Sequence, residues 1–118
     1  LSALKISKTA VSGGFEWQNE QLIYDCVKRE FKEFKEAKNF DEKEDEFGDI
    51  LFAAVNLARY NKINPELALI RANKKFMARF KKMEELTQKP LETLSFEEYD
   101  QLWKKAKIAL QADNNDLN

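Results

Sequence analysis

The chain has 118 residues, of which 35% are charged and 43% hydrophobic, with only three Gly and two Pro. This length predicts one domain over residues 1–118, and the scarcity of Gly and Pro favours long helices over a many-stranded sheet. The 20 basic and 21 acidic residues nearly cancel, which argues against a nucleic-acid polymer as partner, and no apolar run approaches the roughly 20 residues of a membrane span. The single cysteine, Cys26, cannot form an internal disulfide, so we expect a cytoplasmic protein with a buried thiol.

Three helices are expected in the first half of the chain. Residues 1–14 read as a leading helix over 1–12 that ends at the pair Gly13-Gly14, and "GFEW" (14–17) forms a turn. Apolar residues recur at spacings of three and four over 19–38, which predicts a second helix with Asn19 as its N-cap. After a short link at residues 39 and 40, Asp41 can cap a third helix that runs to about residue 61.

Two further helices are expected after residue 61. Asn64 and Pro65 are typical of a helix start, and this fourth helix extends to about residue 87. Ser95, with a glutamate three residues later, forms a capping box for a last helix over 96–111, and residues 112–118 read as a frayed tail. Short links make neighbouring helices antiparallel, so the expected fold is an all-α antiparallel bundle of about five helices.

The third helix carries apolar residues on more than one face, among them Phe47, Ile50, Leu51, Phe52 and Val55. A bundle within one chain would leave part of this surface exposed, and pairing between chains is the ordinary way to cover it. We therefore expect a homodimer or homotetramer.

Two pairs of acids stand at or beside inward positions of the second and third helices. Glu30 and Glu33 are spaced i, i+3, and so are Glu46 and Asp49, which puts each pair on one helix face. If the two helices fold back about residues 39 and 40, Glu33 faces Glu46 and Glu30 faces Asp49. Two charges about 5 Å apart repel by roughly 3 kcal/mol at an effective dielectric of 20, so the four carboxylates need a counter-charge.

A hard divalent cation suits this set of acids. The chain has no histidine, and four carboxylates favour Mg²⁺ or Mn²⁺ over zinc. Mg²⁺ commonly completes its shell with phosphate oxygens, which indicates phosphate-ester chemistry. Gly48, inside the third helix, suggests a close helix approach or a tight ligand. The alternative is that these acids are only a solvated helix face.

Two cations lie one turn apart on the fourth helix. Lys75 and Arg79 are spaced i, i+4, a geometry that suits a polyphosphate, although a solvated basic face would look the same. Trp17 and Trp103 are either core residues or flat surfaces on which a nucleobase can stack.

Taken together in chain order, these segments resemble the MazG-type nucleoside triphosphate pyrophosphohydrolases, as a C-terminal or single catalytic domain. The resemblance covers nearly the whole chain, and its ordered set of motifs is specific. The matching segments are "GFEW" (14–17), "REFKEF" (29–34), "EFGDILFAAVNLAR" (46–59), "ANKKFMARF" (72–80) and "LWKKAK" (102–107).

The resemblance implies Mg²⁺-dependent hydrolysis of NTPs or dNTPs to the monophosphate and pyrophosphate by an all-α, usually dimeric enzyme. It assigns the metal and the catalysis to four acids, which are Glu30, Glu33, Glu46 and Asp49, and the substrate to Lys75, Arg79 and Trp103. We expect Arg29 to bind the substrate as well.

This sequence departs from the family pattern at three positions. Arg29 stands where a glutamate is usual, Glu16 replaces aspartate, and Tyr60 replaces a frequent histidine. The first departure leaves open which acid orients the attacking water.

Two alternative functions remain open at this point. One is a specialised relative, such as a dCTP- or dUTP-directed pyrophosphatase or a phosphoribosyl-ATP pyrophosphohydrolase. The other is a helical interaction module without catalysis.

Overall fold

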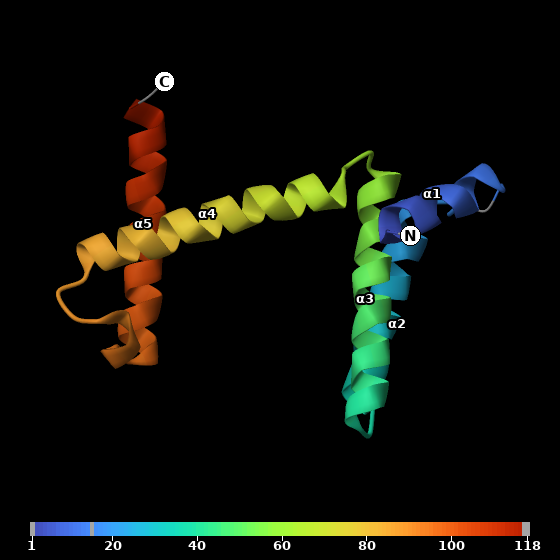
Figure 1. Ribbon diagram of the computed structural model, residues 1–118, viewed down its shortest axis with the longest axis horizontal. Helices are drawn as coiled ribbons and strands as arrows, with labels where there is room; N and C mark the ends of the chain where they lie inside the picture. The colour runs from blue at the N-terminus through green and yellow to red at the C-terminus, as the bar shows by residue number, and fades with distance from the viewer. Residues whose placement is uncertain (1, 15, 117–118) are drawn as a thin grey trace. The chain divides into compact units, whose positions relative to one another are not determined.

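The structure, a computed structural model, describes residues 2–14 and 16–116, and their side chains as far as residue 113. The described residues form five α-helices and one short 3-10 helix and contain no strand, which confirms the all-α fold (Figure 1). None of these helices is long and apolar enough to cross a bilayer. The elements are α1 (Ala3–Ser12), α2 (Glu20–Glu36), α3 (Phe40–Tyr60), α4 (Pro65–Leu86), η1 (Leu91–Thr93) and α5 (Phe96–Asp116).

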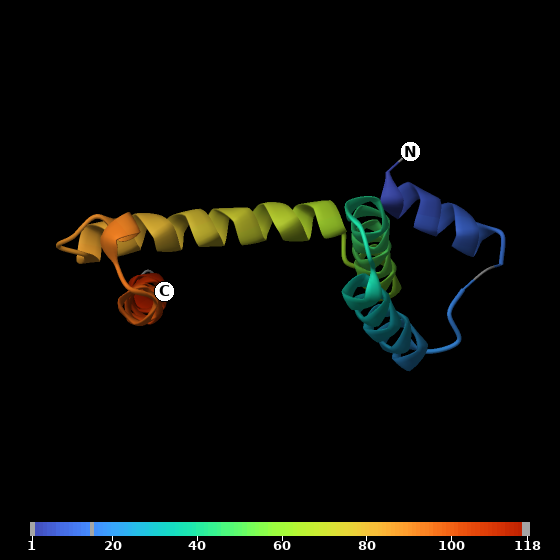
Figure 2. The ribbon, with the colours of Figure 1, turned by 90° about the horizontal axis from the view of Figure 1, so that it is seen from below.

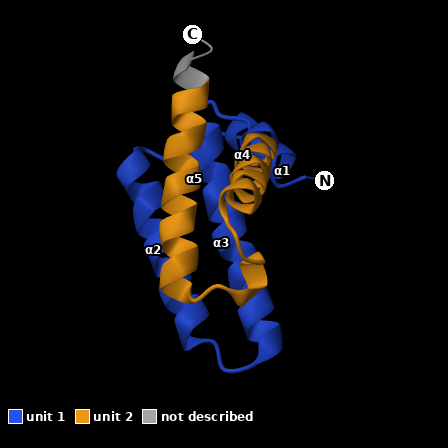
Figure 3. Cartoon of the chain, turned by 90° about the vertical axis from the view of Figure 1, so that its left-hand side faces the viewer, with its two compact units in different colours: residues 1–68 blue, residues 69–118 orange. Residues whose placement is uncertain are grey.

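The chain divides into two compact units, residues 1–68 and 69–118, which Figure 3 shows in different colours. Unit 1 contains the first three helices and the start of α4. Unit 2 contains the rest of α4, η1 and α5.

Side-chain caps fix most of the helix starts where the sequence predicts them. The side-chain oxygens of Asn19 and Asn64 accept backbone N–H groups in the first turns of α2 and α4. Ser95 and Glu98 form the reciprocal capping box of α5, with N···O distances of 3.1 and 3.2 Å. Each cap satisfies donors that the helix itself leaves unpaired.

The start of α3 differs from the prediction by two residues. Asn39, not Asp41, is the N-cap: its backbone is extended, and its Oδ1 accepts the N–H of Glu42 at 2.9 Å. Phe40 is therefore the first helical residue instead of part of a link. Asp41 lies inside the first turn, where a negative charge still stabilises the helix dipole.

The end of α5 also differs from the prediction. The helix continues to Asp116, so the expectation of a frayed tail is wrong for residues 112–116, while 117 and 118 lie outside the described residues. These residues contain no Gly or Pro that would stop a helix. Lys82 of α4 also lies 3.5 Å from the carboxylate of Asp113, which ties this last part of α5 to α4.

The core of unit 1 lies between α2 and α3, which run antiparallel side by side (Figures 1 and 2). Ile23 of α2 is fully buried, and Ile50 and Ala53 of α3 are buried on the facing side. Phe34 and Phe47 meet edge to face, with ring centroids 5.8 Å apart. The register of this hairpin decides which polar side chains of the two helices come together.

A polar network attaches α1 and the following turn to α3. Ser7 is 2% exposed, and its hydroxyl donates to Oδ1 of Asn56 at 2.7 Å and accepts the Nε–H of Arg59. The other guanidinium nitrogens of Arg59 donate to both carboxylate oxygens of Glu16 at 2.7 and 2.8 Å. These hydrogen bonds hold the pKa of Glu16 below its ordinary value.

We expect Ser7→Val to destabilise the protein by about 2 kcal/mol, because it leaves the polar groups of Asn56 and Arg59 near the buried hydroxyl without their partner. Thermal or urea unfolding measures the loss. Thr9→Val, in the same helix, is the matched control: the Thr9 hydroxyl donates only to the local Lys5 carbonyl on an exposed surface, so the change should stay within about 0.5 kcal/mol. Equal losses in both variants would contradict the role of the network.

In unit 2, α4 and α5 cross steeply instead of running antiparallel (Figures 1 and 2). The link between them, residues 87–95, contains η1 and is longer than the links that make neighbours antiparallel. Met83 and Ala106 are fully buried, and Trp103 packs against the rings of Phe76 and Phe80.

Candidate functional site

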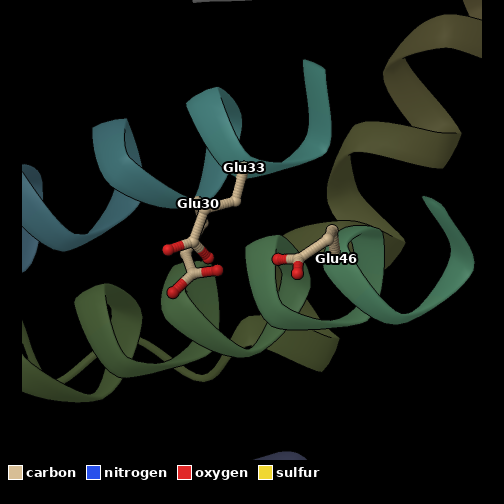
Figure 4. A group of neighbouring side chains, drawn as sticks. All are labelled: Glu30, Glu33 and Glu46. Carbon is tan, nitrogen blue, oxygen red and sulfur yellow. The ribbon is translucent and has the colours of Figure 1, made fainter. Parts of the chain in front are cut away.

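Three of the four predicted metal ligands come together between α2 and α3. One carboxylate oxygen from each of Glu30, Glu33 and Glu46 lies within 4.8 Å of the other two. We call these three residues the acid cluster. Figure 4 shows their side chains: α2 supplies Glu30 and Glu33, and α3 supplies Glu46.

Two oxygens of the acid cluster are shielded from solvent and lack a hydrogen bond. Oε2 of Glu30 and Oε2 of Glu46 have almost no exposed surface and no partner among the described residues. Glu33 is the exposed member of the cluster. A buried carboxylate oxygen without a donor is costly, so the cluster favours a bound cation or a proton.

Burial and mutual repulsion raise the pKa of two of these acids. Burial is the largest cause for Glu30, followed by the charges of Glu33 and Asp49, while Arg29 acts in the opposite direction. Burial also comes first in raising the pKa of Glu46, and the charges of Glu33 and Asp49 add to it. Glu30 and Glu46 therefore hold protons more tightly than isolated glutamates do.

These shifts make the metal-free protein sensitive to pH in a defined direction. The pKa of Glu30 and Glu46 lies above the ordinary 4.5 in the folded chain. The folded state then binds more protons than the unfolded state, and the pair's contribution to the free energy of unfolding falls as pH rises from about 4.5 through the folded pKa.

In EDTA, we expect the double variant Glu30→Gln/Glu46→Gln to melt above the unmodified chain, by a margin that grows between about pH 4.5 and pH 7. Melting curves at several pH values measure this margin. A margin independent of pH would show that the pKa values of the two carboxyls are not raised in the folded chain.

The fourth predicted ligand, Asp49, lies outside this group. It is exposed, and its charge nevertheless acts on both Glu30 and Glu46. Arg29 is exposed on α2, and its charge lowers the pKa of Glu30. The close helix approach suggested by Gly48 is wrong within the described chain, because a Cβ built there meets no atom within 4 Å.

The residues of the acid cluster fit a hard divalent cation. Mg²⁺ binds oxygen ligands at about 2.0–2.1 Å, so two ligands of one ion lie at most about 4.2 Å apart. The oxygens of the cluster, within 4.8 Å of one another, need only small side-chain movements to reach that spacing. An all-carboxylate set suits Mg²⁺ or Mn²⁺ and lacks the nitrogen and sulfur ligands that zinc prefers.

Unit 2 contains a separate group of cations. Lys75 and Arg79 of α4 and Lys107 of α5 line a cavity of about 340 Å³, and we call these three residues the cation cluster. The other lining residues, Ala78, Leu110 and Gln111, carry no charge. Such a cavity suits a ligand with several negative charges.

Sequence reasoning missed Lys107. The signal was present: Lys107 follows Trp103 by four residues, so both lie on one face of a helix. What the sequence does not give is the way α5 crosses α4, and that crossing brings Lys107 to Lys75 and Arg79.

Trp103 lies beside Arg79 of the cation cluster, and neighbouring side chains cover most of its ring. Its ring stacks on Phe76 with centroids 5.6 Å apart and planes at 22°, and Phe80 approaches at a tilt, also at 5.6 Å. The Arg79 guanidinium lies 5.2 Å from the centroid of the Trp103 ring. Trp17, the other tryptophan, is half-buried.

No protein-family model matches the chain. A Thermotoga maritima protein named "Nucleoside triphosphate pyrophosphohydrolase/pyrophosphatase MazG" is 47% identical over 108 residues, which cover 89% of this chain and 42% of that protein. The "Nucleoside triphosphate pyrophosphohydrolase" of Escherichia coli K12 is 36% identical over 120 residues, covering 91% and 44%. "Uncharacterized protein YabN" of Bacillus subtilis 168 is 51% identical over 65 residues, 52% of this chain and 13% of that protein. The chain thus spans less than half the length of the curated relatives it matches.

Proposed function

We propose, from the homology of this chain to part of the MazG-type nucleoside triphosphate pyrophosphohydrolases, that it hydrolyses NTPs or dNTPs to the monophosphate and pyrophosphate with Mg²⁺. The observation that carries the proposal is the acid cluster, with two buried carboxylate oxygens that lack a partner. A solvated acidic face would not bury these oxygens.

In this proposal, the acid cluster and Asp49 hold the metal. Glu30, Glu33 and Glu46 offer oxygens close enough to share an ion, and Asp49 adds negative charge beside them. A divalent cation held there neutralises phosphate charge and makes water a stronger acid. The carboxylates fix the position of the cation's charge. The chain has no histidine that could serve as a ligand in their place.

The cation cluster binds the phosphate groups of the substrate. Lys75, Arg79 and Lys107 face one cavity without an acidic residue in its lining, so their charge is available to a triphosphate and to a departing pyrophosphate. Arg29, the remaining predicted substrate-binding residue, is exposed on α2 and stays a proposed contact to the substrate.

The activity is tested with Mg²⁺ and a panel of NTPs, dNTPs and phosphoribosyl-ATP, with the products separated by anion exchange. We expect monophosphate and pyrophosphate in equal amounts. Turnover of dCTP, dUTP or phosphoribosyl-ATP alone would identify a specialised relative instead of a general enzyme. Release of inorganic phosphate with a diphosphate product, or no turnover at all, would contradict the proposal, and the latter would favour the interaction module.

We also propose that the chain assembles as a homodimer or homotetramer in the cytoplasm. Phe47 and Leu51 of α3 are 48% and 56% exposed, although the same helix packs on α2, and a second copy would bury these side chains. Cys26 is a free and half-buried thiol, which fits a reducing compartment. Sedimentation equilibrium tests the assembly, and a monomer at micromolar concentration would overturn it.

A further inference from the structure

Arg79 lies against two aromatic rings. Its guanidinium carbon is 5.5 Å from the centroid of Phe76 and 5.2 Å from that of Trp103. Phe76 belongs to the preceding turn of α4, and Trp103 comes from α5. The two rings stack on each other, and the guanidinium lies beside both of them. We call Phe76 and Trp103 the aromatic seat.

The aromatic seat holds Arg79 without neutralising it. The ion pairs among the described side chains involve other cations, such as Lys82 and Lys104, and none involves Arg79. A cation over an aromatic face is attracted to the ring but keeps its N–H donors for another partner. Lys75 also lies over the Phe76 ring, with Nζ 5.4 Å from its centroid. Both cations therefore depend on this one ring.

Trp103 is poorly placed to stack on a nucleobase, because Phe76, Phe80 and Arg79 already lie against its ring. We propose that the aromatic seat positions Arg79 for phosphate binding, so that Trp103 acts through Arg79 and Phe76 is a positioning residue. The role in catalysis rests on the proposed function. The binding of a polyphosphate does not, because it needs neither a base nor hydrolysis.

The aromatic seat predicts losses of affinity that are independent of the base. A substitution in the aromatic seat should weaken the binding of a bare polyphosphate as much as that of a nucleotide, because the lost contact is between Arg79 and phosphate. If Trp103 instead stacks on the base, the opposite is expected. The affinity for a bare polyphosphate would be unchanged, and the affinity for purine nucleotides would fall more than that for pyrimidine nucleotides.

Inorganic tripolyphosphate is the probe, and its affinity is measured by calorimetry in Mg²⁺-free buffer with the full chain. We expect Phe76→Leu to weaken binding about tenfold and Phe76→Tyr to restore it to within about twofold, since a tyrosine ring keeps the cation–π contact. Phe80→Leu is the matched control. Phe80 touches the same tryptophan, but Arg79 and Lys75 lie over the other rings, so its effect should stay within about twofold.

A double-mutant cycle tests the role of Trp103. Trp103→Leu should also weaken tripolyphosphate binding about tenfold. It should add little further loss of affinity once Arg79→Gln has removed the guanidinium. Absence of tripolyphosphate binding by the unmodified chain, unchanged affinity in Phe76→Leu and Trp103→Leu, or equal losses in Phe80→Leu would each overturn the inference. Additive losses in the cycle would overturn it as well.

The two proposals fail in distinguishable ways. If the tripolyphosphate affinities change as predicted but NTPs are not turned over, the proposed function is refuted and the role of the aromatic seat is supported. If NTPs are turned over but Trp103→Leu lowers nucleotide affinity in a base-dependent way, the proposed function is supported and the role of the aromatic seat is refuted. For an active enzyme, Phe76→Leu should raise KM for ATP and CTP by the same factor.

Discussion

Glu46→Gln is expected to lower pyrophosphate release about a thousandfold, which corresponds to about 4 kcal/mol of lost transition-state stabilisation. Glutamine keeps the size of the side chain but removes the charge at the point where a half-buried carboxylate from α3 meets two carboxylates from α2. A steady-state assay of pyrophosphate measures the loss, and circular dichroism should show unchanged helical content.

The matched control for this prediction is Glu44→Gln. Glu44 lies on the same helix and is exposed, and the substitution removes the same charge two residues away. Its turnover should stay within about twofold of the unmodified chain, since an exposed charge outside the cluster has little effect on the reaction. Equal losses in the two variants would mean that α3 contributes only its general negative field.

Mg²⁺ is expected to raise the melting temperature of the unmodified chain by about 10 °C. A ligand at 100 times its Kd stabilises the folded state by about 2.7 kcal/mol, and about 1 kcal/mol shifts the melting temperature of a domain of this size by about 4 °C. Without metal, Glu46→Gln should melt above the unmodified chain, because it removes repulsion within the acid cluster.

The variant should also lose most of its response to Mg²⁺. Differential scanning calorimetry with and without the ion measures both effects. Parallel shifts in the unmodified and variant chains would indicate that Mg²⁺ acts elsewhere on the protein.

The convergence of the acids follows from local rules that the sequence displays. Spacing i, i+3 puts Glu30 and Glu33 on one helix face, and a short link forces the next helix to return beside it. The cap at Asn39 shifts the start of α3 by two residues but keeps Glu46 between the helices. Periodicity does not fix how far Asp49 reaches toward the others, because that depends on side-chain rotation at an exposed position.

The arrangement in unit 2 was less accessible from sequence. Lys75 and Arg79 share a face by helical spacing alone, whereas the approach of Lys107 and Trp103 depends on how α5 crosses α4. A link of residues 87–95 with its own 3-10 turn sets that crossing. Neither the cation cluster nor the covered ring of Trp103 could be derived from a pattern within one helix.

Titration with Mn²⁺ followed by electron paramagnetic resonance tests the central claim most directly, because bound Mn²⁺ loses the sharp signal of the free ion. The account predicts that the unmodified chain removes the free signal and that Glu30→Gln/Glu46→Gln, which keeps the helices but not the buried charges, leaves it in solution. Equal binding by both proteins, or a free signal in both, would contradict the acid cluster as a divalent-cation site.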